Sequence, residues 1–170
     1  MKKKVVIVGL GLMGGSMAMA IHKYTDNEVY GYNRTRSVAE RALADGTLDG
    51  IADDNIIAEA DIMIISLYPQ ATVDFLIEKM PKMKKGAIIV DLVGVKKYLD
   101  EKLTEPAKKA GVHFIGGHPM AGKEFSGYAF ADADLFQDAS MILVPNASSP
   151  LWAVDEMDGF FNALGFGQVV

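Results

Sequence analysis

The segment Gly116–Gly122, GGHPMAG, places a histidine between a pair of glycines and a proline. It follows Val112–Ile115, a short apolar run that is typical of a buried strand. Because α/β enzymes keep reactive groups at the carboxyl ends of strands, we predict that His118 is catalytic, and that the glycines let the backbone approach a ligand. A neutral imidazole can accept a proton from a substrate hydroxyl while hydride leaves the substrate carbon. The alternative is a tight turn whose histidine points at water. His22, in a helical pattern, and His113, at the start of a strand, are poorer candidates.

Near the N-terminus, VVIVGLGLMGGS contains a motif of the form G-x-G-x-x-G. It follows an apolar run and opens a helical pattern, which is the context in which this motif binds a dinucleotide. The first glycine permits a tight turn, the second lets the backbone approach a diphosphate at the helix N-terminus, and the third lets helix and strand pack closely. A glycine-rich turn without a ligand is the alternative. The residues that we predict to bind cofactor here are Gly9, Gly11, Leu12, Met13 and Gly14.

The residues after the second strand pattern, GYNRT, bear on which dinucleotide is bound. Domains that prefer NAD place an Asp or Glu here to bind the ribose 2′-hydroxyl. This chain has Asn33 in that position, followed by Arg34 and Thr35, and Arg36 adds a second positive charge. Asn33 does not repel a 2′-phosphate, and Arg34 and Thr35 can bond to one. We therefore predict that these three residues bind the cofactor and that NADP is favoured over NAD. The alternative is that the arginines are solvated residues at a helix start.

Two later strand patterns end in residues that we expect to complete the cofactor cleft. The segment IISLYP places Ser66, Leu67 and Tyr68 after one pattern, and VDLVGVK places Asp91 to Lys96 after the next. Both segments should lie at the carboxyl edge of a parallel sheet, near the nicotinamide. We predict cofactor contacts from Ser66, Leu67 and Asp91.

These sites need a framework, and the apolar pattern along the chain predicts one. Short β-branched runs alternate with helical patterns. This alternation predicts an α/β fold of the Rossmann type, a doubly wound and mainly parallel sheet with helices on both faces. The ending GFGQVV predicts a helix-capping glycine and the start of another strand. The predicted strands are 5–8, 29–32, 62–67, 87–91, 112–115 and 141–144, and the predicted helices are 13–24, 37–45, 72–80, 95–110 (with a break at Pro106 as an alternative) and 151–164.

The composition is that of one globular domain. The chain has 170 residues, half of them hydrophobic, a net charge of -5 and no cysteine. The negative charge gives no basic surface for nucleic acid or an anionic membrane, and no apolar stretch is long enough to span a membrane. The N-terminal residues imitate a signal peptide, but their glycines have the spacing of a phosphate-binding turn. Without cysteine, disulfides, thiolate metal sites and a cysteine nucleophile are excluded, and we predict a cytoplasmic location and no metal site.

The segments GLGLMGGS and GGHPMAGKEFSGYAFADADLF together resemble the prephenate/arogenate dehydrogenases of tyrosine biosynthesis. The resemblance covers essentially the whole chain as the N-terminal dinucleotide-binding domain of that family. It implies an NAD(P)-dependent oxidoreductase that oxidatively decarboxylates prephenate to 4-hydroxyphenylpyruvate, or arogenate to tyrosine. It also implies that His118 binds and polarises the C4 hydroxyl of the substrate ring. Glu124 matches a family glutamate that helps to shape the substrate entrance, with a simple surface acid as the alternative.

The chain departs from the family pattern in two ways. The family has a serine in a D-x-x-S-x-K loop that bonds to the substrate hydroxyl, whereas this chain has Gly94 there, between the matching Asp91 and Lys96. We expect Gly94 to lie near the substrate, with a water or backbone group in place of the serine or with weakened activity. The family also has a helical second domain, which provides a substrate-binding arginine and the dimer interface. We expect residues 1–170 to lack that domain and, when isolated, to turn over poorly as a monomer or weak dimer.

Two other functions stay open. The motif GLGLMG with NRT also occurs in β-hydroxyacid dehydrogenases, although GGHPMAGKEFSG argues against that family. The other alternative is a nucleotide-binding module without turnover.

Overall fold

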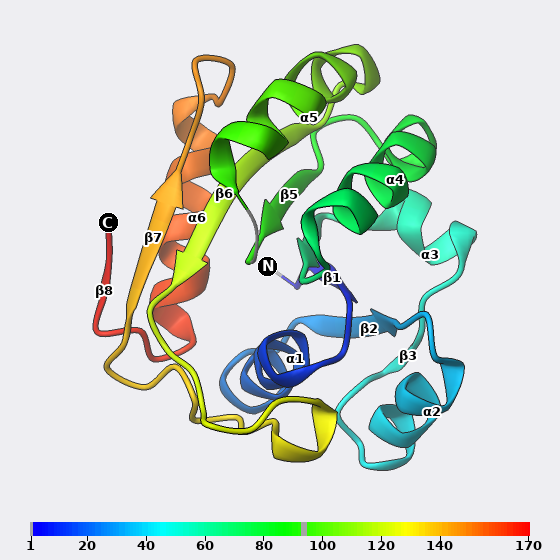
Figure 1. The fold of residues 1–170 in the computed structure, drawn as a ribbon, viewed down its shortest axis with the longest axis vertical. Coiled ribbons are helices and arrows are strands. Elements are labelled where there is room, and N and C mark those ends of the chain that lie inside the picture. The colour runs from blue at the N-terminus through cyan, green and yellow to red at the C-terminus, as the bar shows by residue number, and fades with distance from the viewer. Residues whose placement is uncertain (1, 93–94) are drawn as a thin grey trace.

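The computed structural model describes residues 2–92 and 95–170. Within this part of the chain, eight strands form one sheet in the order β3-β2-β1-β4-β5-β6-β7-β8 (Figure 1). Neighbouring strands run parallel except β6 and β7, which are antiparallel. The strands are β1 (Lys4–Val8), β2 (Glu28–Tyr32), β3 (Gly50–Ile51), β4 (Ile62–Ile65), β5 (Ile88–Asp91), β6 (His113–Pro119), β7 (Ser140–Val144) and β8 (Gln168–Val169).

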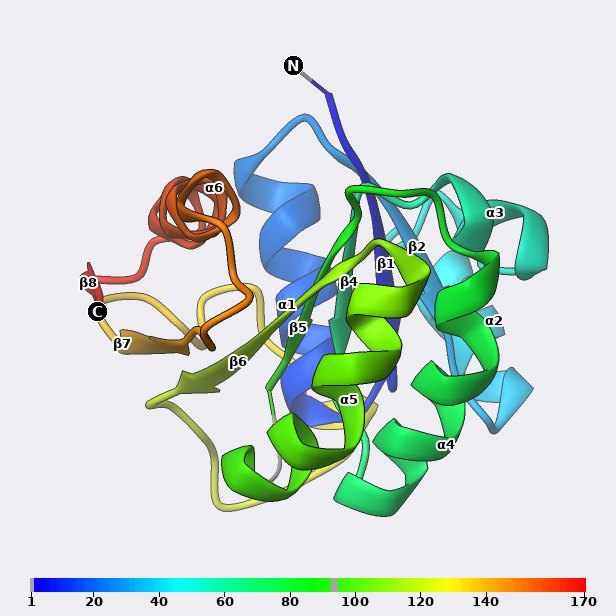
Figure 2. The same cartoon turned by 90° about the horizontal axis from the view of Figure 1, so that it is seen from above.

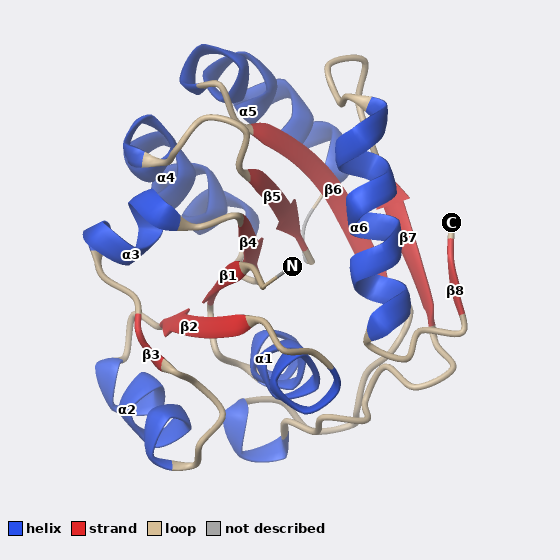
Figure 3. Ribbon diagram, turned by 180° about the vertical axis from the view of Figure 1, so that it is seen from behind, coloured by secondary structure: helices blue, strands red, loops and turns tan. Residues whose placement is uncertain are grey.

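Helices cover both faces of the sheet, as Figures 2 and 3 show from two sides. One face packs against α1, α2, α6 and the short 3-10 helix η2, and the other packs against α3, α4, α5 and the 3-10 helix η1. This arrangement confirms the predicted doubly wound α/β fold. The helices are α1 (Leu12–Tyr24), α2 (Arg36–Ala44), α3 (Asp54–Glu59), α4 (Pro69–Lys79), η1 (Met80–Lys82), α5 (Lys96–Ala110), η2 (Tyr128–Phe130) and α6 (Leu151–Ala163).

The central strand β1 shows why the apolar runs form buried strands. Val5, Val6, Ile7 and Val8 are all 0% exposed. Val5 and Ile7 pack into the core beneath α1 and α6, whereas Val6 and Val8 pack into the core beneath α4 and α5. Side chains alternate between the two faces of a strand, so a strand that is covered on both faces needs an apolar residue at every position.

Three features differ from the sequence-based prediction. The pattern does not predict β3 and α3, which have only two and six residues, too few to show a period. Helix α5 continues unbroken through Pro106, so the alternative of a break there is wrong, and the helix ends at Gly111, whose φ is +76°.

The third difference is the length of β6. The prediction ends this strand at Ile115 and places His118 in the following loop, which is wrong. The strand continues to Pro119 because β7 pairs with it in antiparallel register, with His118 opposite Ile142. Glycines and a proline disfavour a strand on propensity alone, but the backbone partner outweighs that preference here. The backbone of His118 is therefore fixed by the pairing of β6 with β7.

Candidate active site

Strands β1, β2, β4, β5 and β6 end at one edge of the sheet, towards which their arrows point in Figure 2. The chain passes from β1 to β2 on one side, whereas β4 lies on the other side of β1. The winding of the sheet therefore reverses between β1 and β4. In open α/β sheets, ligands bind outside the carboxyl ends of the strands at such a reversal.

The glycine motif forms a tight loop between β1 and α1 at this reversal. Gly9 has a φ of +91°, which favours glycine. A Cβ atom at Gly9 would overlap the carbonyl oxygen of Ser66, and a Cβ atom at Gly14 would overlap the carbonyl oxygen of Gly9. These two glycines are therefore required by the close approach of β1, β4 and α1 to one another.

Gly11 differs from the other two glycines of the motif. No atom lies within 4 Å of the place where its Cβ would stand, and the residue is exposed. Helix α1 begins at the next residue, Leu12, without a side-chain cap and without an acidic residue in its first turn. The first N–H groups of a helix have no partner within the helix, and with the helix dipole they bind anions. The turn that contains Leu12 and Met13 therefore fits a dinucleotide diphosphate.

Asn33 lies directly after β2, as predicted, and its side chain bonds to the backbone on both sides. Its Oδ1 accepts a hydrogen bond from the Leu10 N–H at 2.8 Å, and its Nδ2 donates to the Thr35 carbonyl oxygen at 3.0 Å. Asn33 thereby fixes the glycine loop to the end of β2. An aspartate could keep the first bond, but it would place a negative oxygen against the Thr35 carbonyl.

Arg34 and Thr35 both have exposed side chains next to that loop. No ion pair or side-chain hydrogen bond engages Arg34 among residues 2–92 and 95–170, whereas Arg36 Nε lies 3.6 Å from Glu40 Oε1. Arg34 is therefore the cation at this position whose guanidinium is available to a ligand.

Ser66 and Leu67 follow β4 and contact the glycine loop. The Ser66 N–H donates to the Val8 carbonyl oxygen at 2.8 Å, which continues the pairing of β1 with β4. A side-chain carbon of Leu67 lies 3.0 Å from the place of a Cβ at Gly9. The structure thus brings both residues to the predicted cofactor loop, and the next residue, Tyr68, is 84% exposed at the same edge.

Asp91, the last residue of β5, has a side chain that is 0% exposed. Its Oδ2 accepts a hydrogen bond from Lys96 Nζ at 2.6 Å. Burial raises the pKa of the Asp91 carboxyl group, while the Lys96 ammonium opposes that rise by favouring the carboxylate. The carboxylate holds Lys96 and presents no exposed surface to a cofactor. Gly94, between the two, lies outside the described residues.

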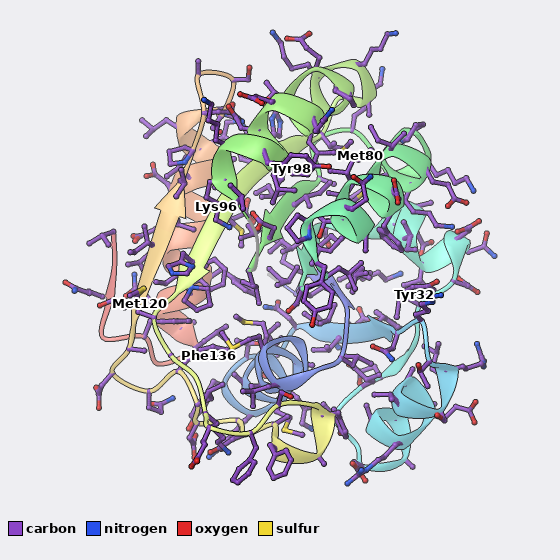
Figure 4. All side chains as sticks on the ribbon, viewed as in Figure 1. Tyr32, Met80, Lys96, Tyr98, Met120 and Phe136 are labelled. Atoms are coloured by element: carbon purple, nitrogen blue, oxygen red, sulfur yellow. The ribbon has the colours of Figure 1, made fainter. Side chains whose placement is uncertain are left out.

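His118 has an exposed side chain on β6. Because side chains alternate along a strand, it lies on the same face of the sheet as Gly116. Lys96, the first residue of α5, reaches across this face, and a Cβ at Gly116 would lie 3.1 Å from its Cδ. Figure 4 shows Lys96 at the base of α5 over β6, and Met120 just past the end of the strand. A histidine and a lysine thus share one face of the carboxyl edge.

The glycine pair before His118 is explained by packing between strands. A Cβ at Gly117 would lie 2.7 Å from Met141 Cε and 2.8 Å from Val90 Cγ1. We expected Gly116 and Gly117 to let the backbone approach a ligand, but the space beside both glycines is filled by other residues of the protein. Gly122 has no atom within 4 Å of its Cβ position.

Glu124 lies in the exposed segment that follows β6, Met120–Gly127, which we call the β6 loop. Phe125 in this loop is 59% exposed and stacks on Phe130, with ring centroids 5.0 Å apart. The role of Glu124 at a substrate entrance stays a prediction. In the described part of the chain, no group of three or more His, Asp or Glu side chains is placed to hold a metal ion.

One buried residue near the site was missed by sequence reasoning. Tyr128, the residue directly after the β6 loop, is only 7% exposed and packs against α1. A signal for it existed in Gly15, a glycine directly after the dinucleotide motif that the motif itself does not require.

Residues 17–169 of the chain match the protein family described as "Prephenate dehydrogenase, nucleotide-binding domain". The chain belongs to this family. The cyclohexadienyl dehydrogenase of Zymomonas mobilis is 31% identical over 166 residues, which cover 96% of this chain and 56% of the relative. The resemblance to this nucleotide-binding domain, stated from the two sequence segments, is confirmed.

Solved structures place the fold of this nucleotide-binding domain in the same group. The arogenate dehydrogenase of Synechocystis has a TM-score of 0.87 at 27% identity and covers 98% of this chain and 58% of its own. A prephenate dehydrogenase from Aquifex aeolicus, in complex with hydroxyphenyl propionate and NAD+, has a TM-score of 0.84 at 22% identity and covers 100% and 59%. The chain therefore spans a little over half the length of these relatives. No helix in residues 2–92 and 95–170 is long and apolar enough to cross a membrane.

Proposed function

We propose that this chain is the cofactor domain of a prephenate dehydrogenase that uses NADP. The observation that carries the proposal is the exposed His118 at the sheet edge where the uncapped start of α1 also lies. A base and a diphosphate-binding loop at one edge suit the oxidation of an alcohol by a nicotinamide. The names of the relatives support a cyclohexadienyl ring as the substrate class.

In the proposed reaction, His118 accepts the proton of the ring hydroxyl as hydride leaves the same carbon. The ring carboxylate then leaves as carbon dioxide, and His118 returns the proton to the oxygen as the ring becomes aromatic. The bound dinucleotide supplies the acceptor for the hydride. Lys96, held by Asp91 at 2.6 Å, contributes positive charge on the face that His118 shares, and positive charge attracts an anionic substrate.

NADP is the cofactor that the end of β2 favours. Asn33 carries no charge, and the guanidinium of the exposed Arg34, which has no ion-pair partner among the described residues, can bind a 2′-phosphate. The diphosphate would bind at Gly11, Leu12 and Met13, where the first turn of α1 is uncapped.

Arogenate in place of prephenate is the second candidate, because the fold of the Synechocystis arogenate dehydrogenase is so similar. The two substrates differ in a keto or amino group on the side chain. Turnover of the full-length protein with each substrate decides between them. A dimeric full-length protein and a cytoplasmic location also belong to this proposal.

The substitution His118→Asn in the full-length protein tests the proposed chemistry. We expect the variant to keep cofactor affinity and to lose about 10²–10⁴-fold in kcat, the usual contribution of a general base. His22→Asn, an exposed histidine on α1, is the matched control. Near-normal turnover of His118→Asn would contradict the proposal.

A further inference from the structure

The β6 loop is fixed at its first residue by the sheet. The Met120 N–H donates to the Ser140 carbonyl oxygen at 2.8 Å. Between this bond and Tyr128 the loop is mostly exposed, and it carries Glu124. The position of the loop relative to the end of β6 therefore depends on what holds its second end.

Tyr128, directly after the loop, is held by a partly buried polar network. Its hydroxyl donates to Asp45 Oδ2 at 3.0 Å, and it lies 3.1 Å from Thr47 Oγ1. The Arg41 guanidinium lies over its ring, 5.5 Å from the centroid. Asp45, Thr47 and Arg41 belong to the end of α2 and the turn after it, so the phenol joins the β6 loop to the helix that follows Arg34.

Gly15 forms the socket for this tyrosine ring. A Cβ at Gly15 would lie 2.9 Å from Tyr128 Cδ1 and 3.0 Å from Ala131 Cβ. The next residue of α1, Ser16, accepts a hydrogen bond from the Asp132 N–H at 2.9 Å. The same first turns of α1 that fit the cofactor diphosphate therefore also hold the end of the β6 loop.

We propose that Tyr128 is a positioning residue that fixes the β6 loop, with Glu124, relative to the cofactor helix α1. The part of this proposal that concerns catalysis rests on the proposed function. Tyr128 acts on the substrate only through the loop, so its loss should weaken substrate binding more than the chemical step. The phenol is not among the groups that we propose to contact the cofactor, which include Gly11 and Arg34.

The mobility of the loop can be measured without any turnover. Lys123 lies within the loop, and its Nζ donates to the Phe130 carbonyl oxygen at 2.9 Å, so tryptic cleavage after Lys123 reports how freely the loop moves. We expect Tyr128→Phe to accelerate this cleavage roughly two- to tenfold, as the loss of one hydrogen bond implies. Tyr30→Phe is the matched control, because it removes a part-buried bond from a tyrosine hydroxyl to Glu28, 2.6 Å long, elsewhere. Thr47→Val should act in the same direction if Tyr128→Phe fails to fold.

The catalytic part is tested in the full-length protein by steady-state kinetics. We expect Tyr128→Phe to raise the KM for prephenate several-fold, while kcat and the dissociation constant for NADPH stay close to wild type. Unchanged cleavage after Lys123, or the same acceleration in Tyr30→Phe, would overturn the positioning role whether or not the protein turns over prephenate. Faster cleavage with an unchanged KM would overturn the link to the substrate.

Discussion

At the scale of single residues, Asn33 and Arg34 have different roles at the end of β2. Asn33 Oδ1 accepts the Leu10 N–H at 2.8 Å, so this side chain sets the shape of the glycine loop. Arg34 is exposed beside it, and its positive charge is the one that we propose to bind a 2′-phosphate. For this reason Asn33→Asp disturbs the loop as well as the charge, and a change at Arg34 tests cofactor choice more cleanly.

We predict that Arg34→Ala weakens NADPH binding about tenfold or more and leaves NADH binding nearly unchanged. A hydrogen bond to a charged group is worth about 1.5–3 kcal/mol, and only NADPH carries the 2′-phosphate that makes this bond. Fluorescence titration of both cofactors with wild type and variant measures the effect. NADH in the same variant is the internal control, since damage to the fold would weaken both. Equal losses for the two cofactors, or a wild type that prefers NADH, would contradict the NADP assignment.

The residues that could be foreseen are those whose role is local. One tight turn requires Gly9 and Gly14, and the spacing of these glycines is enough to predict that turn. The packing of Tyr128 against Gly15 depends on residues that are far apart in the sequence. The burial of Asp91 likewise depends on β6, whose Gly116 pairs with it. No local sequence pattern contains those contacts. Sequence reasoning therefore placed Asp91 correctly at the end of its strand but did not predict its hydrogen bond to Lys96 or any role for Tyr128.

At the scale of elements, periodicity predicted the long helices and the buried strands, because each must present apolar residues at a fixed spacing. It failed at β3 and α3, which are too short, and at the end of β6. There the chain is extended because β6 pairs with the antiparallel strand β7, and this pairing leaves no apolar pattern in the segment GGHP. The neighbouring strands β5 and β7 leave no room for a side chain at Gly117, which explains why a glycine occupies this position.

We predict that Gly117→Ala destabilises the fold by about 1–3 kcal/mol, the usual cost of overpacking a core. Its Cβ would lie 2.8 Å from Val90 Cγ1 and 2.9 Å from the Asp91 carbonyl oxygen, and the backbone oxygen cannot move without disturbing β5. Gly122→Ala is the matched control, because nothing lies within 4 Å of its Cβ. Urea unfolding of both variants gives the comparison. Equal stability of the two would mean that the strands adjust freely around Gly117.

At the scale of the whole molecule, one group of charged contacts lies at the amino edge of the sheet, opposite the site. Asp61, just before β4, accepts the Lys4 N–H at 2.8 Å and pairs with Lys84. Burial alone would raise the pKa of Asp61, but the Lys84 ammonium and the Lys4 N–H outweigh it and lower that pKa. His113, the first residue of β6, lies at this edge too, and its ring meets Trp152 edge to face at 5.2 Å. Asp61 and His113, two groups whose pKa values depart from their ordinary values, therefore lie at the edge opposite His118.

Burial lowers the pKa of His113 below its ordinary value of 6.5. The unfolded chain thus binds a proton at this position more readily than the folded protein does. The stability that neutral His113 contributes is fully present above pH 6.5 and is lost as the pH falls through the lower folded pKa.

We predict that the free energy of unfolding falls as the pH is lowered from about 7.5 to about 5, and that His113→Asn flattens this fall because it removes the titrating group. Trp152 is the single tryptophan of the chain, so its fluorescence can follow urea unfolding at each pH. The variant should be less stable at neutral pH, where the ring contact with Trp152 is lost, and it should approach wild type in acid. His22→Asn, at the exposed end of α1, is the matched substitution that controls for the loss of a histidine elsewhere. A slope that survives unchanged in His113→Asn would contradict this origin of the acid sensitivity.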